Sequence, residues 1–233
     1  MRIDAIASSS HGNLYIVSDR DTRILLECGL SRRKTLKALG ADMLGVQGIL
    51  VSHEHKDHAA CAGDMIVEGM KVYMSEGTGE ALELEGYIPI ADREQFEIGT
   101  LGIVPFEVFH DAAEPLGFLI QSRVDGDTLA FATDTVNLAY RFPGLDILAI
   151  EANYDKNILE RSEKLPEKIK KRIGNAHMEI RTLCAYLQSL DLSKCREIHL
   201  LHLSDAMSRE YEFIHRVREV IPCGIEVTAA RRE

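Results

Sequence analysis

The chain has 233 residues, of which 45% are hydrophobic and 27% charged, as in a typical globular protein. No stretch reaches the roughly 20 consecutive apolar residues that a membrane-spanning helix needs, and Met1–Asp4 lacks the apolar segment of a signal peptide. The formal net charge of −10 lowers the expectation of tight nucleic-acid binding without excluding it. We therefore expect a cytoplasmic protein with no membrane partner, folded as one domain over residues 1–233.

The cysteines do not predict a cross-linked protein. Their number is odd, they are widely spaced, and no Cys-x-x-Cys pair occurs. A disulfide framework or a cysteine zinc site is therefore not expected. Most of these residues are expected to be small buried apolar groups; they are Cys28, Cys61, Cys184, Cys195 and Cys223.

The first half of the chain alternates between short strands and helices. Ser31 is expected to cap a helix that Gly40 ends. The first turn of this helix, Arg32-Arg33-Lys34, carries positive charge that opposes the helix dipole, so it either meets a substrate phosphate or forms a solvated face. The predicted strands are 2–7, 14–17, 23–28, 49–51 and 71–74, and the predicted helices are 31–39, 57–67 and 76–84.

The second half begins with β-structure and ends with helices. Asp125-Gly126 predicts a hairpin turn, and the wholly apolar run after Asp146 predicts a buried strand. The alternation of strand-rich and helical parts predicts an α/β fold with two sheets stacked between helical layers, a four-layer αββα sandwich. The predicted strands are 95–98, 101–109, 116–124, 128–132, 146–150, 197–201 and 225–227, and the predicted helices are 156–163, 166–173, 178–190 and 207–220.

Four potential metal ligands follow the predicted strand 49–51 within six residues. They are His53, His55, Asp57 and His58. The first two are two residues apart, so an extended backbone points both rings the same way. Imidazole and carboxylate ligands without thiolate suit Zn, Mn or Fe. The alternative, a solvated polar loop, is weaker because three histidines in six residues are improbable in a chain with 9 His.

Three further candidate ligands each come at the end of an apolar strand. They are His110, Asp134 and His202. Strands packed side by side bring such ends to one edge, where loops on a rigid scaffold carry chemistry. His199 competes with His202, but the two residues point to opposite faces of a strand, and His202 ends the apolar run.

The motif His-x-His-x-Asp-His resembles that of the metallo-β-lactamase-fold hydrolases, which hold one or two metals at the edge of an αββα sandwich. Over nearly its full length the chain is most similar to the small bacterial proteins of the WalJ/YycJ type, a family related to RNase J and tRNase Z. The further points of resemblance are Ser8-Ser9-Ser10 with Gly12-Asn13, Cys28-Gly29-Leu30-Ser31, His110-Asp111-Ala112 with Gly117-Phe118, Ala132-Thr133-Asp134-Thr135, Glu151-Ala152-Asn153-Tyr154-Asp155 and Leu201-His202-Leu203-Ser204-Asp205.

This resemblance implies two divalent metal ions. His110 would join His53 and His55 on the first metal, His202 would join Asp57 and His58 on the second, and Asp134 would bridge the two. The chain also departs from the family pattern. Glu27 stands where many members have an aspartate beside a metal-bound histidine, and it is either such a partner or a surface residue at a strand end. Ala176-His177-Met178-Glu179 replaces Gly-His-Leu-Ser, and Thr-Asp-Thr-Val replaces Thr-Asp-Thr-Gly.

The same resemblance implies cleavage of phosphodiesters, notably 5′→3′ exonuclease action on DNA. Asp57 and Asp134 would be catalytic through the metals, and His177 would bind the phosphate or protonate the leaving oxygen. Lys171 and Arg172 belong to a basic run at 164–172 that could bind the strand, although a solvated helix face explains it as well. His177 could likewise be a surface residue before a helix.

Two other functions remain open from the sequence. A small-molecule hydrolase acting on a lactone, thioester or cyclic nucleotide fits the acidic charge and the single expected domain. A non-enzymatic relative is less expected, because such a protein would lose ligands first. Neither the metal, nor the polarity of cleavage, nor the oligomeric state can be assigned from these residues.

Overall fold

The computed structural model describes residues 1–230, and for Asp42 only the backbone. The chain folds into two compact units. The first comprises residues 1–107 and 112–128, and the second comprises residues 108–111 and 129–230. None of the helices within residues 1–230 is both long and apolar enough to cross a membrane.

A six-stranded mixed sheet forms the body of the first unit. Its strands follow one another in chain order, antiparallel from β1 to β3 and parallel from β3 to β6. The strands are β1 (Arg2–Ser9), β2 (Gly12–Ser18), β3 (Arg23–Leu26), β4 (Val46–Leu50), β5 (Val72–Met74) and β6 (Ile88–Pro89). Its helices are α1 (Arg32–Leu39), the 3₁₀ helix η1 (Gly40–Gly45), α2 (Lys56–Ala59), α3 (Ala62–Val67) and α4 (Glu76–Ala81).

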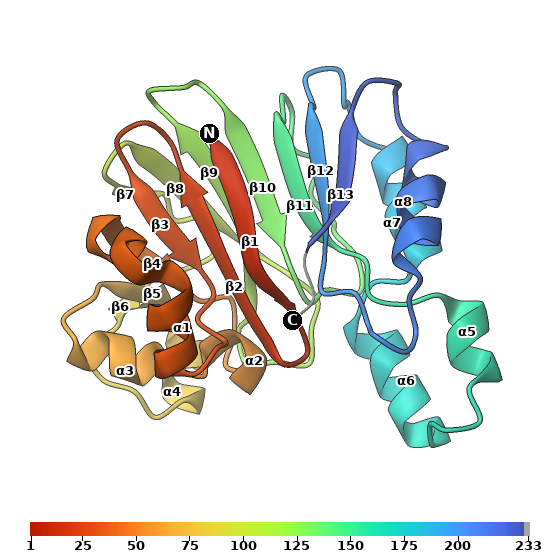
Figure 1. Ribbon diagram of the computed structural model, residues 1–233, viewed down its shortest axis with the longest axis horizontal. Helices are drawn as coiled ribbons and strands as arrows, with labels where there is room; N and C mark the ends of the chain where they lie inside the picture. The colour runs from red at the N-terminus through yellow and green to blue at the C-terminus, as the bar shows by residue number, and fades with distance from the viewer. Residues whose placement is uncertain (231–233) are drawn as a thin grey trace. The chain divides into compact units, whose positions relative to one another are not determined.

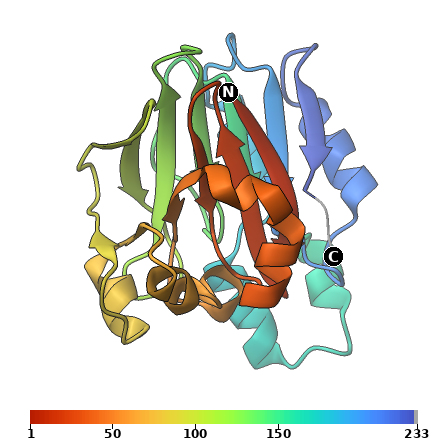
Figure 2. The same cartoon turned by 60° about the vertical axis from the view of Figure 1, so that its left-hand side comes forward.

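Helix α1 lies over the face of strands β2 and β3, as Figure 1 and Figure 2 both show. Leu39 at its end packs into a core with Leu25 and Ile49, all of them buried. The helix ends where expected, because Gly40 adopts φ 51°, a backbone conformation that suits glycine. This packing anchors the strands whose ends carry candidate site residues.

The helix predicted at 57–67 is instead two short helices, α2 and α3, with a break at Cys61. The amide of Cys61 donates to the carbonyl of Cys28 at 3.1 Å, rather than to the carbonyl of Asp57. That carbonyl accepts the side-chain amide of Asn13 at 3.1 Å. Long-range hydrogen bonds therefore interrupt the helix, which local sequence could not reveal.

Three antiparallel strands complete the first unit. They are β7 (Phe96–Ile98), β8 (Leu101–Glu107) and β9 (Leu116–Ser122). Asp19, in the turn after β2, accepts hydrogen bonds from the hydroxyls of Thr100 at 2.6 Å and Ser122 at 2.7 Å. It also accepts the backbone amides of Asp21 and Thr22. This carboxylate therefore ties the β2–β3 turn to the antiparallel strands.

Replacing Asp19 with asparagine is expected to destabilise the protein by about 1 kcal/mol at pH 7, since hydrogen bonds to a charged acceptor are lost in a partly solvated site. Burial alone would raise the pKa of Asp19, but the hydrogen bonds from Thr100 and Ser122 and the two amides lower it below its ordinary value. The stabilisation is therefore present above the pKa of the unfolded chain, about 4, and is lost as pH falls through the lower folded-state pKa.

Urea unfolding of both proteins between pH 7 and pH 3 measures this difference. The exposed carboxylate of Asp21, in the same turn, provides the control variant Asp21→Asn. A difference between wild type and Asp19→Asn that grows toward low pH would contradict the expected sign.

The second unit is built on four parallel strands. Their order is β13-β12-β11-β10. The strands are β10 (Thr128–Ala132), β11 (Ile147–Glu151), β12 (Glu197–Leu201) and β13 (Glu226–Ala229). The helices are α5 (Lys156–Arg161), α6 (Glu167–Ala176), α7 (Ile180–Gln188) and α8 (Glu210–Arg218), with α7 and α8 in contact beside the strands (Figure 1).

The registers of β10, β11 and β12 explain how the second unit gathers side chains. Ala132 pairs with Ile150, and Glu151 pairs with Leu201. The carboxyl ends of these strands therefore lie at one edge of the sheet, and the residues that follow them emerge there. Strand β12 has the predicted bounds, whereas α8 begins three residues later than predicted, at Glu210.

Candidate metal-binding site

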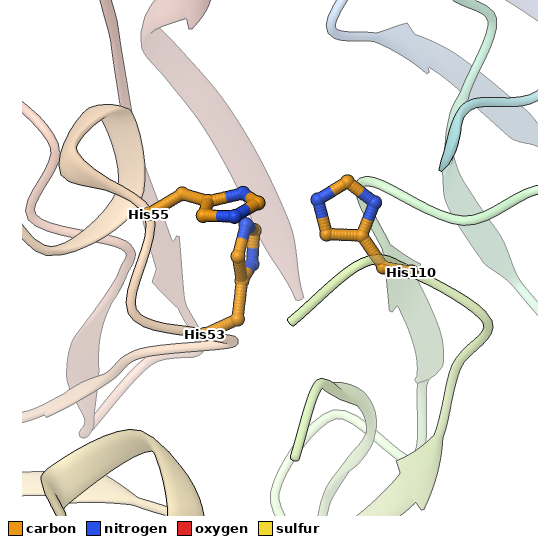
Figure 3. A group of neighbouring side chains, drawn as sticks. All are labelled: His53, His55 and His110. Atoms are coloured by element: carbon orange, nitrogen blue, oxygen red, sulfur yellow. The ribbon is translucent and has the colours of Figure 1, made fainter. Parts of the chain in front are cut away.

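The loop after β4 gathers the histidines of the first unit. His53 and His58 are buried and His55 is half-buried. The ring centroids of His53 and His55 are 4.7 Å apart, edge to face, and those of His53 and His58 are 4.2 Å apart. Figure 3 shows the rings of His53 and His55 brought together from this loop. Asp57 Oδ2 lies 3.5 Å from His58 Nε2, so the loop presents nitrogen and oxygen donors together.

Glu27 is a buried partner of this loop and not a surface residue. Its side chain has no solvent exposure, its Oε1 lies 3.6 Å from His58 Nδ1, and its Oε2 accepts the amide of Ser52 at 3.2 Å. The hydroxyl of Ser52 is in turn 2.8 Å from His53 Nδ1. The 3.6 Å separation is too long for a hydrogen bond, but a carboxylate near Nδ1 favours the tautomer with the proton on that atom, which leaves Nε2 as the possible ligand atom.

Contacts made by Asn13 and Gly29 fix the position of the same loop. The side-chain amide of Asn13 lies 3.1 Å from the carbonyl oxygen of Asp57 and 3.1 Å from His58 Nε2. The amide of Gly29 donates to the carbonyl of Asn13 at 2.9 Å. A Cβ on Gly29 would lie 1.6 Å from the carbonyl oxygen of Asp57, so only glycine permits this approach.

Replacing Gly29 with alanine is therefore expected to displace the loop that carries Asp57. The expected cost is about 1–3 kcal/mol in the free energy of unfolding, with weaker divalent-metal binding. Urea unfolding and a zinc competition titration measure the two effects. Gly102→Ala is the matched control, because its added Cβ would meet nothing closer than 3.6 Å. Equal metal affinity in the wild type and Gly29→Ala would refute the prediction.

His110 belongs to the second unit, on the segment that follows β8 (Figure 3). Its Nδ1 donates to the carbonyl of Ala176 at 2.8 Å, and its Nε2 lies 3.5 Å from Asp134 Oδ2. Burial is the main cause that lowers the pKa of His110, although the charge of Asp134 acts in the opposite direction. A neutral ring with its proton on Nδ1 directs the Nε2 lone pair toward the edge where Asp134 lies.

Asp134 and His202 follow β10 and β12 at that edge, and both are buried. His202 Nδ1 lies 3.0 Å from Asp134 Oδ1, which also accepts the hydroxyl of Thr133 at 2.9 Å. Their φ angles are 50° for His202 and 33° for Asp134, and Glu27 has φ 65°. These three are among five non-glycine residues with positive φ within residues 1–230. Backbone strain is therefore concentrated at candidate site residues, as is common in functional sites.

Glu151 was not among the predicted site residues, yet it organises the second unit's half of the site. It is fully buried, and its Oε2 accepts the amides of Thr135 at 2.8 Å and Met178 at 2.9 Å. Its Oε1 lies 2.7 Å from His177 Nδ1 and 3.2 Å from His202 Nδ1. The available signal was its position, a charged residue directly after the apolar run of β11.

Glu151 and His177 form an ion pair. Burial opposes a charge on His177, but the negative charge and hydrogen bond of Glu151 outweigh it and raise the pKa of this imidazole. Burial likewise opposes the charge on Glu151, and His177 and His202 lower the pKa of that carboxyl. Asp134, Glu151, His177 and His202 each offer one ligand atom, and these atoms lie within 4.8 Å of one another. The cluster can therefore bind a cation or transfer a proton.

Three further residues considered from the sequence, Lys171, Arg172 and His199, lie outside this cluster. Arg172 Nε binds Asp111 Oδ2 at 2.9 Å on the surface, and Lys171 is exposed on α6. His199 contacts Thr228 Oγ1 at 2.9 Å and Glu197 Oε2 at 3.1 Å, away from Asp134 and Glu151. His199 is therefore not part of the cluster formed by Asp134, Glu151, His177 and His202.

Comparisons with known proteins show what the whole chain is similar to. Residues 22–201 match the sequence profile of the β-lactamase superfamily domain. The chain is 32% identical over 221 residues to exodeoxyribonuclease YycJ of Bacillus anthracis, covering 88% of this chain and 83% of that protein. It is 30% identical over 226 residues to exodeoxyribonuclease WalJ of Streptococcus pneumoniae, covering 85% and 80% of the two chains. The crystal structure of the metallo-β-lactamase-fold protein YhfI from Bacillus subtilis is similar with a TM-score of 0.74 at 16% identity, over 98% of this chain and 96% of that one.

Proposed function

The chain belongs to the metallo-β-lactamase superfamily and has its α/β sandwich fold, with two mixed sheets flanked by helices, and from this premise we propose that it is a metal-dependent exonuclease that degrades DNA from the 5′ end. The similarity to two exodeoxyribonucleases over most of both chains supports a nucleic-acid substrate. The net charge of −10 opposes general affinity for phosphate backbones, so recognition of the strand would depend on local positive charge around the site.

We propose that the candidate ligands of the two units serve one binuclear centre. His53, His55 and His110 would hold the first divalent ion, His58, Asp57 and His202 the second, and Asp134 would bridge them. The donor chemistry supports this assignment. His110 Nδ1 donates to a backbone carbonyl, and the Nδ1 atoms of His58 and His202 lie beside buried carboxylates. Imidazoles oriented in this way through Nδ1 fit Zn, Mn or Fe at Nε2.

Two divalent ions bound to these residues would polarise a phosphodiester and lower the pKa of a bound water toward about 7. Asp57 and Asp134 would supply carboxylate oxygens and negative charge to hold the ions. His177 has 20% of its side chain exposed, so substrate can reach it. With Nδ1 on Glu151, the remaining ring nitrogen, Nε2, can give a proton to the leaving oxygen.

The position of His177 is the observation that most favours a phosphodiester substrate. A charged general acid can donate a proton to the leaving oxygen of a phosphodiester. The negative charge of Glu151 raises the pKa of this imidazole above its ordinary value and so favours the protonated form. Lys171 and Arg172, on the helix that leads to His177, would bind the phosphates of the strand. Each neutralised phosphate would make the affinity more sensitive to salt.

The test is cleavage of a 5′-phosphorylated, labelled single-stranded DNA in the presence of Mn or Zn. The double variant Asp57→Ala/His58→Ala should be inactive, and His199→Gln, a histidine outside the proposed ligand set, should be as active as the wild type. Parallel reactions contain bis-p-nitrophenyl phosphate and a lactone. Stepwise loss of 5′ nucleotides by the wild type supports the proposal, whereas lactone turnover with intact DNA would replace it with the small-molecule hydrolase.

A further inference from the structure

A cavity in the first unit borders the loop that carries Asp57. Its volume is about 420 Å³, within the range of about 300–1,000 Å³ typical of small-molecule sites. Three separate segments form its walls: the β1–β2 turn at His11, the start of α1, and helices α2 and α3. The cavity therefore adjoins the proposed metal ligands but contains only one of them, Asp57.

The charges around this cavity favour an anion. Arg32, Lys34 and Lys56 line it together with two carboxylates, Asp57 and Asp64. Arg32 is paired with Glu68. Within residues 1–230, Lys34 and Lys56 have no ion-pair partner, and both are exposed. If Asp57 serves a metal ion, its charge is compensated there, and the two lysines outnumber the remaining carboxylate, Asp64.

The start of α1 is arranged against the helix dipole. Its first turn has three basic residues and no acidic one, and the side chain of Ser31 makes no capping hydrogen bond. Positive side chains at this end oppose the helix dipole and reduce helix stability, and a bound anion would offset that cost. Of the three basic residues, Arg32 and Lys34 line the cavity and Arg33 does not.

We propose that this cavity binds a phosphate group of the DNA strand other than the phosphate that is cleaved, with Lys34 and Lys56 as its charged contacts. This inference rests on the proposed function, because that function makes DNA the source of the phosphate. The binding of a nucleotide phosphate by the two lysines does not depend on whether the protein cleaves DNA. The cavity would thereby position the strand relative to the metal ligands.

Titration of thymidine 5′-monophosphate into the metal-loaded full chain, followed by calorimetry, tests the binding without turnover. Thymidine is the matched neutral probe and should not bind. Lys34→Ala, which is far in sequence from every proposed ligand, should raise Kd about threefold, and Lys34→Ala/Lys56→Ala about tenfold, as expected for partly solvated ion pairs. Arg33→Ala, on the same turn but outside the cavity, is the control and should bind like the wild type. Metal content, measured on each variant, separates lost phosphate contacts from lost metal.

An unchanged Kd in Lys34→Ala and in the double variant would overturn the proposal. Lysine-dependent binding without DNA cleavage would retain the phosphate site and reject the exonuclease. DNA cleavage with a Kd that is unchanged in both lysine variants would reject the phosphate site and retain the exonuclease.

A further comparison measures kcat/KM of Lys34→Ala on DNA with a 5′-phosphate and on DNA with a 5′-hydroxyl. A loss confined to the phosphorylated strand identifies the terminal phosphate as the ligand. An equal loss on both strands identifies an internal phosphate.

Discussion

Replacing Glu151 with glutamine is expected to lower the free energy of unfolding by about 3 kcal/mol, because one partner of a buried, hydrogen-bonded ion pair is removed. The carboxylate accepts the amides of Thr135 and Met178 and faces Nδ1 of His177 and His202, so all four neighbours need an acceptor. Glutamine supplies one acceptor oxygen and turns an NH₂ group toward the other donors. Urea unfolding measures the loss, and Glu160→Gln, an exposed glutamate of the same unit, should unfold like the wild type.

The same substitution should reduce kcat/KM by about 10–100-fold, the range found when a residue that orients metal-bound histidines is changed. Because Glu151 acts through His177 and His202, its effect should not add to that of His177→Ala. Additive losses in the double variant would show that Glu151 does not act through His177. A stability loss with full activity would reduce Glu151 to a purely structural residue.

Replacing Asp134 with asparagine is expected to reduce kcat/KM by about 10²–10³-fold, comparable to the loss of one preorganised electrostatic group in an active site. Asparagine is the informative substitution because it keeps the shape of the side chain and tolerates positive φ, so the strain at φ 33° is not increased. What changes is the negative charge that the proposed metal pair shares.

Metal analysis of the purified variant should find fewer bound ions per chain than in the wild type, and excess Mn should restore activity only in part. Asp191→Asn, an exposed carboxylate of the second unit, is the control. Full metal content together with full activity in Asp134→Asn would remove Asp134 from the proposed bridging role.

The parts of the fold that depend on local pattern could be predicted from the sequence. β12 has its predicted bounds because a short apolar run is confined between polar residues, and α1 ends at Gly40 because glycine alone tolerates the backbone there comfortably. The break at Cys61 could not be predicted, because it depends on a hydrogen bond to Cys28, which lies 33 positions earlier in the chain. Helix propensity has no information about such a partner.

The candidate site, like the fold, was predictable from the sequence only in part. The cluster around His53 was predictable because its donors are adjacent in sequence. The function of Glu151 was not, because its four partners come from three distant segments and only the fold brings them together. Glu27 was undecided for the same reason, since a glutamate at a strand end is equally compatible with solvent until the burial of its carboxylate is known.

Each unit orients its own candidate ligands through one buried glutamate, Glu27 in the first and Glu151 in the second. Both carboxylates are anchored on backbone amides next to strand ends, and neither uses the surface loops at 136–145 or 111–115 for support. The anchors of both carboxylates would therefore stay in place if those loops changed in length or composition over evolutionary time. Selection for a new substrate would then have these loops to act on without disturbing the two glutamates.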